Sequence, residues 1–357
     1  MPGNERVVLE EVPQIGFYGS LPGPHCPEDF CFEGALRSCL QFLGERYGCS
    51  HRPELQPGYR TECGYAYLMT VSGSAFFMNW PGWPGEPHAA FNVLSPVRFV
   101  ENAFAAVGYD HTIVRRNGED ELQRTVIESI RDHRRPVMGL GVSAGPPEPA
   151  IVAGYDEGGD VLIGWSFFQR DPGPEAEFEP SGMFRMRGWY EHTPGLIVIG
   201  EKRDEPPLED VYRTTLRLGV DSLGGGLRAY QAWADDLHND ERFSGADEAE
   251  LRRLHEVHDQ TVGTIAEARH YGNMCLREMA AFRPSVSAQL LEAAACLSAE
   301  HDLMWDAWNA LGGLQCPTAW QECAKAEKRR EMAPIVLRSR DNAARAVELM
   351  NGALEEW

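Results

Sequence analysis

The sequence predicts an α+β domain followed by an all-helical domain. Up to about residue 204 the 357-residue chain is rich in Gly, Pro and aromatic residues, and beyond it Ala, Leu, Glu and Arg dominate. In the first part, helical patterns precede short apolar runs, which is an α+β order rather than a βαβ repeat. The segment 203–207 (RDEPP) has the charges and prolines of a linker. We therefore expect domains over residues 1–204 and 205–357.

Helices are expected first in the α+β domain. Apolar residues recur at helical spacing in residues 30–46, and Asp29 stands where an N-cap residue is expected. Residues 96–107 and 120–134 show similar patterns. Short apolar runs then predict strands, and the EGGD sequence at residues 157–160 predicts a hairpin turn. The expected strands are residues 137–142, 150–155, 161–168, 182–186 and 196–201.

Long helical patterns fill the second domain. Gly224–Gly226 is expected to break the first of them, and Pro284 and the pair Gly312–Gly313 separate later ones. The expected helices are residues 208–223, 227–237, 247–282, 285–311 and 317–355.

The composition narrows the classes of function. With 33 basic and 54 acidic residues the net charge is −21, so the chain repels phosphate backbones and anionic lipids, and we expect no nucleic-acid or membrane partner. No apolar stretch is long enough to span a bilayer, and the first residues do not form a signal peptide. The nine cysteines include no CxxC pair. We therefore expect a cytoplasmic protein with reduced thiols and no metal or other cofactor.

Cys31 is the candidate nucleophile. It falls in the first turn of a predicted helix, where the helix dipole and the first N–H groups favour a thiolate. Papain-like enzymes place their nucleophile at such a position. However, Glu28, Asp29 and Glu33 surround Cys31 in the sequence, and negative neighbours raise the pKa of a thiol. A buried structural cysteine is the alternative interpretation.

The base that would activate Cys31 is not evident. A cysteine nucleophile normally uses a His, and in the papain-like order this His begins a strand after the helices. Here Glu148 and Pro149 stand at that point, and Trp165 and Ser166 stand where the Asp or Asn partner is expected. We expect the base to be Glu148 or an unplaced His, with His88 as the first to examine. The other histidines of this part are interpreted as surface residues: His25, His51, His111, His133 and His192.

Two further regions of the chain contain candidate site residues. Ser72 and Gly73 precede an aromatic stretch that contains Trp80; this segment either lines a pocket, with Trp80 as a wall, or is a packed loop. In the helical domain, Glu267 and His270 form a Glu-x-x-His motif, but carboxylate-bridged metal sites need two such motifs from different helices. We interpret these residues as solvated helix faces, together with His255, His258, Glu300 and His301.

The segment 26–40 (CPEDFCFEGALRSCL) resembles the N-terminal domain family of butirosin biosynthesis protein H. Ser72–Gly73, the strand pair within residues 147–165 and the segment 227–237 (LRAYQAWADDL) are similar to further motifs of the same family. The resemblance implies a papain-like cysteine-peptidase fold and a bacterial antibiotic-biosynthesis protein. For the family's namesake it implies acyl transfer from a carrier-protein thioester to an aminoglycoside amine. It also implies that Cys31 is the nucleophile.

Two functions therefore remain open. The first is a papain-like acyltransferase or amide hydrolase that uses Cys31 with Glu148 and acts on a small molecule or on an acyl thioester, with an acyl carrier protein as a possible partner. The second is a non-catalytic domain of the same fold that binds a small molecule or peptide. In either case we expect Cys31 and Glu148 to converge with the binding residues in one cleft. The expected binding residues are Ser72, Gly73, Trp80 and Trp165.

Overall fold

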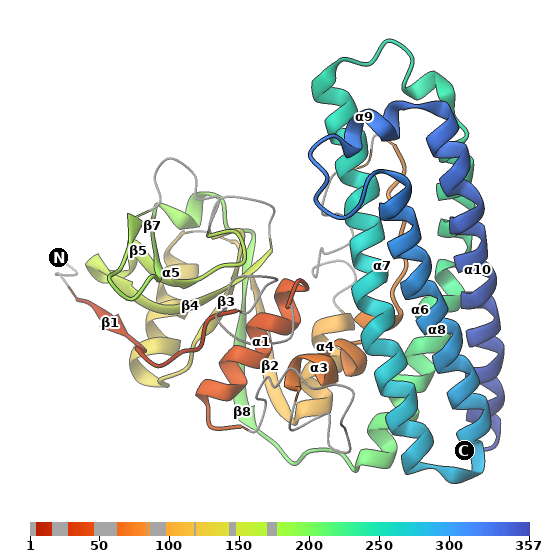
Figure 1. Cartoon of the computed structure of the whole chain (residues 1–357). Coiled ribbons are helices and arrows are strands. Elements are labelled where there is room, and N and C mark those ends of the chain that lie inside the picture. Colours follow the sequence, from red (N-terminus) through yellow and green to blue (C-terminus); the bar gives the residue numbers. More distant parts are fainter. Residues whose placement is uncertain are drawn as a thin grey trace. The chain divides into compact units, whose positions relative to one another are not determined.

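The structure is a computed structural model of the chain (Figure 1). It describes residues 5–15, 28–45, 63–83, 85, 98–117, 119–142, 148–169 and 177–357. The chain divides into two compact units. The first, here called the sheet unit, comprises Met1–Leu68 and Phe91–Pro206. The second, the helical unit, comprises Met69–Ala90 and Pro207–Trp357, so it includes a segment that lies well before residue 204 in the sequence.

An antiparallel sheet forms the centre of the sheet unit. Every pairing is antiparallel, and the order is β2-β8-β3-β4-β5-β7-β6, with β1 beside β4. The predicted α+β class is therefore confirmed. Counted over the described residues, the eight strands are β1 (Val7–Val8), β2 (Tyr109–Arg115), β3 (Val137–Leu140), β4 (Pro149–Asp156), β5 (Val161–Trp165), β6 (Glu177–Phe178), β7 (Phe184–Arg187) and β8 (Gly195–Lys202).

The central strands follow from their apolar runs. All residues of β3 and β5 are buried, and only the last residue of β4 is not. The turn predicted between β4 and β5 is present: Glu157 and Gly158 have φ angles of +51° and +68°, and the Asp156 carboxylate accepts a hydrogen bond from the Glu157 N–H at 2.7 Å. Gly164 has a steric role, because a Cβ there would lie 1.8 Å from the Ile151 carbonyl oxygen.

Helices accompany the sheet. The helix α1 (Cys31–Phe42) packs against β4 and β3, and α4 (Arg98–Val107) packs against β2. The helix α5 (Glu119–Ile127) continues into a π-helical turn at Glu128–Asp132. The helix α3 (Gly64–Ser72) was not predicted, and the boundary between the two units falls within it.

Four long helices build the helical unit, with α7 against α8, α8 against α10 and α10 against α6 (Figure 1). Their bounds are α6 (Leu208–Leu237), α7 (Glu248–Phe282), α8 (Ser287–Ala310) and α10 (Ala326–Glu355), and a short α9 (Ala319–Ala324) precedes α10. The single helix predicted over residues 317–355 is thus wrong, because Lys325 adopts an extended conformation between α9 and α10.

The predicted break at Gly224–Gly226 is also wrong, since α6 is continuous through it. Each glycine in a helix interior costs about 1 kcal/mol relative to alanine, but tertiary packing can offset that cost. A Cβ at Gly226 would lie 2.7 Å from the Cβ of Met78 in the same unit. The missing side chain therefore lets residues 74–80 lie directly on α6.

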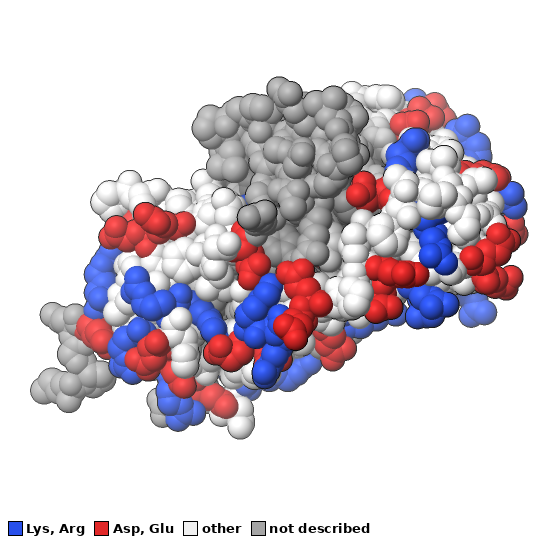
Figure 2. Space-filling view, turned by 90° about the horizontal axis from the view of Figure 1, so that it is seen from below, with Lys and Arg blue, Asp and Glu red and all other residues white. Residues whose placement is uncertain are grey.

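The surface of the described residues is strongly charged. On the face that Figure 2 shows, acidic and basic side chains lie interspersed. None of the described helices is both long and apolar enough to cross a membrane.

Candidate functional site

Cys31 is the first residue of α1, and its side chain is 3% exposed. The chain enters the helix through Phe30, whose extended backbone makes it the N-cap, so the prediction that Asp29 is the N-cap is wrong. The first backbone bond at the start of the helix joins the Gly34 N–H to the Phe30 carbonyl at 3.1 Å. The N–H groups of the residues before Gly34 point out of the N-terminal end of the helix, where they can donate to groups outside it.

Tyr65 is a site residue that the sequence did not reveal. Its hydroxyl accepts a hydrogen bond from the Phe30 N–H at 2.9 Å and so fixes the residue before Cys31. Tyr65 lies in α3 and is fully buried. A buried tyrosine usually needs a polar partner, but the sequence alone does not say which one.

One of the three acidic neighbours of Cys31 is neutralised. Glu28 forms an ion pair with Arg37, and both side chains are buried. Gly34 makes this possible sterically, because a Cβ there would lie 3.3 Å from the Cβ of Glu28. Arg37 also donates to the Gln14 carbonyl oxygen at 3.2 Å, which ties α1 to the N-terminal segment.

Glu33 and Glu148 both carry buried carboxyl groups, and the two residues are 2% and 6% exposed. Glu148 directly precedes β4, the strand against which α1 packs, and its carbonyl accepts a hydrogen bond from the Gly141 N–H at 3.1 Å. Burial, reinforced by the charge of Glu33, raises the pKa of Glu148 well above its usual range. Glu33 lies in the first turn of α1, as Cys31 does, so the charge that acts on Glu148 comes from the start of this helix.

Trp165 belongs to the same unit as Cys31. It ends β5 opposite Ile151 of β4, and its indole N–H donates to the Val12 carbonyl at 2.9 Å. Gly182 has a φ of +91°, and a Cβ there would make an ordinary van der Waals contact with the indole ring at 3.6 Å. Trp165 is 9% exposed, and its predicted role in binding stays a prediction.

Ser72, Gly73 and Trp80 belong to the helical unit. Ser72 is buried, with its hydroxyl 3.2 Å from the Met69 carbonyl, and Gly73 follows the end of α3 with φ of +97°. The Trp80 indole stacks on Trp233 at 5.5 Å and donates to an Asp236 carboxylate oxygen at 2.6 Å. These contacts are those of a packed segment, which was one of the two interpretations. A cleft shared by these residues and Cys31 stays a prediction.

The described histidines His111 and His133 do not have contacts that indicate a catalytic base. His25, His51 and His88 lie outside the described residues. His111 stacks on Phe104 with ring centroids 4.6 Å apart, and His133 lies 3.8 Å from the Glu128 carboxylate in an exposed pair. Among the described residues, Glu148 is the predicted base that can be examined.

The interpretation of the helical-unit residues as solvated is wrong for His258 and Glu300, which are both buried. His258 accepts a hydrogen bond from the Trp233 indole at 3.2 Å, and burial lowers its pKa to about 3. Glu300 accepts from Arg269 at 3.0 Å and from the Tyr230 hydroxyl at 2.5 Å. In the part of the chain that the structure describes, no group of three or more His, Cys, Asp or Glu side chains could hold a metal ion.

Arg269 also explains how residues 74–80 attach to the bundle. Its guanidinium donates to the carbonyl oxygens of Ala75 and Phe77 at 3.0 and 3.1 Å, in addition to Glu300. The guanidinium thereby satisfies one backbone acceptor at a buried position and one at a partly buried position. The Tyr230–Arg269–Glu300 cluster, named by these three residues, therefore joins α6, α7 and α8 to this segment.

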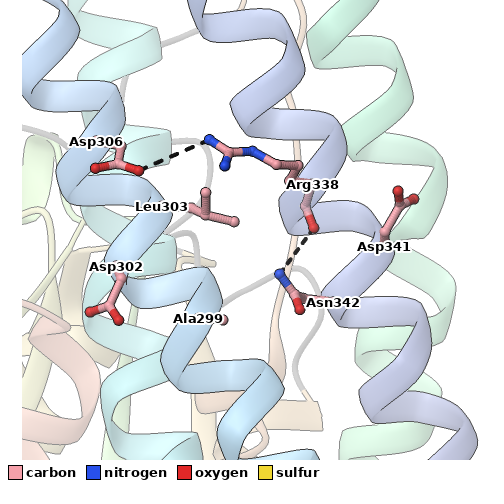
Figure 3. A pocket seen from close by; sticks show the side chains of 7 residues that line it. All are labelled: Ala299, Asp302, Leu303, Asp306, Arg338, Asp341 and Asn342. Atoms are coloured by element: carbon pink, nitrogen blue, oxygen red, sulfur yellow. Dashed lines mark hydrogen bonds and ion pairs between the residues drawn. The ribbon is translucent and has the colours of Figure 1, made fainter.

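An open groove lies between α8 and α10 of the helical unit (Figure 3). Arg338 and Asp306 approach each other across it at 4.0 Å, and the Asn342 amide donates to the Arg338 carbonyl at 3.1 Å. No motif in the sequence indicates this groove. Its lining residues are Ala299, Asp302, Leu303, Asp306, Arg338, Asp341 and Asn342.

No model of a known protein family matches the chain, and no curated protein matches it either. The residues around Cys31 are therefore the ground on which a function can be proposed.

Proposed function

We propose that the chain is a cysteine-dependent acyltransferase with a papain-like sheet unit, in which Cys31 takes an acyl group from a thioester and Glu148 moves the protons. One observation carries the proposal: a cysteine begins the helix that packs on an antiparallel sheet, and a buried carboxyl of raised pKa lies at the same helix end. In the papain-like arrangement that we propose, Glu148 would stand in the place of the histidine.

The helix start supports Cys31 as the nucleophile. The dipole of α1 and the N–H groups of its first turn stabilise negative charge, both on a thiolate and on the oxyanion that forms when a thiolate attacks a carbonyl. Tyr65 holds the residue before Cys31 in place through the Phe30 N–H. The thiol therefore has a fixed position relative to these donors.

The raised pKa supports Glu148 as the proton-transfer group. An ordinary carboxyl, with a pKa of about 4.3, is too weak a base to compete for the proton of a thiol with a pKa of about 8.5. Proton transfer is most effective when the pKa of the catalytic group lies near the working pH. Burial and the charge of Glu33 move Glu148 in that direction.

A thioester suits this site better than an amide. An amide can be cleaved only if its leaving nitrogen is protonated, which is the task of the imidazolium in enzymes with a histidine. A leaving thiolate has about the same basicity as the attacking one, so exchange between two sulfurs needs less acid assistance. Acyl transfer from a thioester, as on an acyl carrier protein, is therefore favoured over amide hydrolysis. The acceptor is a small molecule.

The second candidate is a non-catalytic domain that binds a small molecule or peptide. The observation that favours it is the burial of Cys31, of which only 3% is exposed. A thiol that substrate does not reach would be a core residue, and Glu33 and Glu148 would then be part of a polar interior.

The test is acylation of the protein by a simple thioester, acetyl-N-acetylcysteamine, followed by mass spectrometry of the intact chain and of its peptides. We expect one acetyl group on Cys31, absent from Cys31→Ala and retained in Cys39→Ala, where burial raises the pKa of the replaced thiol to about 12. Cys316 is the background thiol, because hydrogen bonding with Thr318 lowers its pKa. Labelling of Cys316 without Cys31 would contradict the enzyme and favour the binding domain.

A further inference from the structure

We propose that the outer face of α8 binds a second copy of this chain, so that two copies form a symmetric dimer with their α8 helices antiparallel. The face is built from positions that recur every three or four residues and therefore lie on one side of the helix. We call it the α8 stripe, and its residues are Ala288, Leu291, Ala295, Ser298, Asp302 and Trp305. All of them belong to the helical unit, so the inference does not rest on the proposed function.

The α8 stripe exposes large apolar side chains on an otherwise polar bundle. Leu291 is 43% exposed and Trp305 is 41% exposed, and they are two of the six exposed large apolar side chains among the described residues. By contrast, the exposed residues of α10 are all charged or polar, apart from Pro334. Tryptophan is enriched at protein interfaces, whereas charged residues are depleted from their centres. The outer face of α8 therefore has the composition of an interface.

Trp305 is held in a fixed orientation before any partner binds. Its indole N–H donates to the Nε2 atom of His301 at 3.0 Å, and the Nδ1 atom of the same histidine lies 2.7 Å from the Ala266 carbonyl oxygen. The ring also contacts the ring of Trp308 edge to face, with centroids 5.0 Å apart. A side chain that is already ordered loses little conformational entropy on binding. Trp305 is therefore suited to anchor an interface.

The spacing of the α8 stripe matches a second copy of itself. Leu291 and Trp305 lie at equal distances in sequence before and after Ser298. An antiparallel pairing centred on Ser298 places Leu291 of one copy against Trp305 of the other, and the two-fold symmetry repeats this contact. Ala295 and Ser298 are small, so the two helices can approach closely at the centre. The stripe is therefore self-complementary in shape.

The charges on α8 favour the antiparallel over the parallel pairing. In a parallel pairing Asp302 and Glu292 would each face the same residue of the second copy, and like charges that face each other destabilise a contact. In the antiparallel pairing the two Asp302 side chains are separated by eight helix positions, or about 12 Å along the axis. The antiparallel arrangement therefore avoids the repulsion.

Arg345 provides the opposite charge. It donates to Glu292 at 2.8 Å, so it lies on α10 at the height of this residue. The two-fold rotation brings it to a height between Asp302 and Asp306 of the second copy. Asp302 makes no ion pair or hydrogen bond within the described part of the chain, and Asp306 approaches Arg338 only at 4.0 Å (Figure 3). The acidic end of the stripe therefore meets a basic side chain in the dimer.

The size of the face is sufficient for a specific but modest dimer. With 24 residues, α8 is about 36 Å long. If the contact also includes the adjoining side chains of α7 and α10, it is about 20 Å wide and buries about 700 Å² per copy, close to the value of about 800 Å² per partner in standard interfaces. Interfaces of this size have dissociation constants from micromolar downwards.

The test is sedimentation velocity of the full chain between about 1 and 100 μM, where a micromolar dimer dissociates on dilution. We expect a concentration-dependent dimer for the wild type. Ala295→Arg places a long charged side chain in the stripe, and each substitution acts twice in a symmetric dimer, so it should weaken dimerisation about 100-fold or more. Trp305→Lys should have a similar effect. Leu314→Lys is the matched control, because Leu314 is 39% exposed outside the stripe, and it should dimerise like the wild type.

Thiol cross-linking tests the orientation of the helices. In a parent chain with Cys296→Ser and Cys316→Ser, a short thiol cross-linker should link two copies of the Ser298→Cys variant above the level of the parent. It should not link two copies of the Ala288→Cys variant, because these positions are about 30 Å apart in the antiparallel pairing. Ala295 is exposed, so Ala295→Arg should retain the circular dichroism and thermal unfolding of the wild-type monomer.

A wild type that stays monomeric over the whole concentration range would overturn the inference. A dimer that Ala295→Arg leaves intact would place the interface on another face and would overturn it as well. Cross-linking of both Ser298→Cys and Ala288→Cys would show a parallel pairing and contradict the charge argument. None of these results depends on acylation of Cys31, so they are separate from the test of the proposed function.

Discussion

Replacement of Glu148 by Gln should change how the stability of the sheet unit depends on pH. Compared with the wild type, the variant should gain stability as the pH rises from acidic to neutral. Burial and the Glu33 carboxylate raise the pKa of Glu148 in the folded chain, whereas the unfolded chain titrates near about 4.3. Between these two values the folded protein keeps a proton that the unfolded chain has released. The stability that Glu148 contributes is therefore complete below the unfolded pKa and is lost as the pH rises through the folded pKa.

The magnitude follows from the linkage relation. Each pH unit within this window lowers the free energy of unfolding by about 1.4 kcal/mol, so two units lower it by about 2.7 kcal/mol. The Glu148→Gln variant has no proton to lose there. The stability of the variant minus that of the wild type should rise by the same amount over the same window. For a domain with a total stability of about 5–15 kcal/mol this is a large effect.

The assay is urea unfolding of both proteins at pH 5, 6, 7 and 8. Hydrogen exchange of peptides from β3 and β4, read by mass spectrometry, follows the sheet unit separately from the helices. Glu179→Gln is a control that should show no such rise, because Arg6 and Arg185 lower the pKa of Glu179 and the stability from that ion pairing is lost only as the pH falls below about 4.3. Parallel curves for wild type and Glu148→Gln from pH 5 to 8 would refute the reasoning.

Three further outcomes concern the helical unit. Arg269→Met should cost about 3–5 kcal/mol in urea unfolding, since it leaves Glu300 as an unpaired buried charge, and the double variant with Glu300→Leu should recover most of that loss. Gly225→Ala, where a Cβ meets nothing within 4 Å, should stabilise by up to about 1 kcal/mol, whereas Gly226→Ala, which would overlap a neighbouring side chain, should destabilise by about 1–3 kcal/mol in the same measurement. Burial lowers the pKa of His258 to about 3, so the helical unit should lose about 1.4 kcal/mol per pH unit below about 6.5, and His258→Gln should flatten this dependence in acid-unfolding curves.

The sequence predicts the strands of the sheet best where burial is complete. The strands β3, β4 and β5 are continuous apolar runs between turn residues, and such runs identify a strand that is covered on both faces. The strand β2 was missed because it follows α4 after a single residue and its burial is mixed. The helix α3 was missed because its GYAYLMTVS sequence is apolar on nearly all sides. A helix of this kind shows no helical periodicity in its apolar residues.

Tertiary contacts explain the errors in the helical unit. The sequence predicted a break at Gly224–Gly226 because isolated glycines disfavour a helix. In the structure the third of these glycines is needed for the close approach of Met78 to α6. His258 and Glu300 were interpreted as solvated because charged residue types are usually exposed, but inside the bundle Trp233 donates to one nitrogen of His258 and Arg269 donates to one oxygen of Glu300. Such partners come from other helices, so the spacing within one helix does not reveal them.

The candidate site shows the same limit in electrostatic terms. The sequence places three acidic residues next to Cys31, and counting them suggests a strongly negative surrounding. The fold changes this count, because Arg37 neutralises Glu28 and because burial and the charge of Glu33 raise the pKa of Glu148. Linear order was sufficient to propose Cys31 and Glu148, since a helix start and the first residue before a packed strand can be located in the chain. Which carboxyl carries charge and which carries a proton depends on burial and on partners from other elements. This distribution of charge, rather than the number of acidic residues, decides whether the site can move a proton at neutral pH.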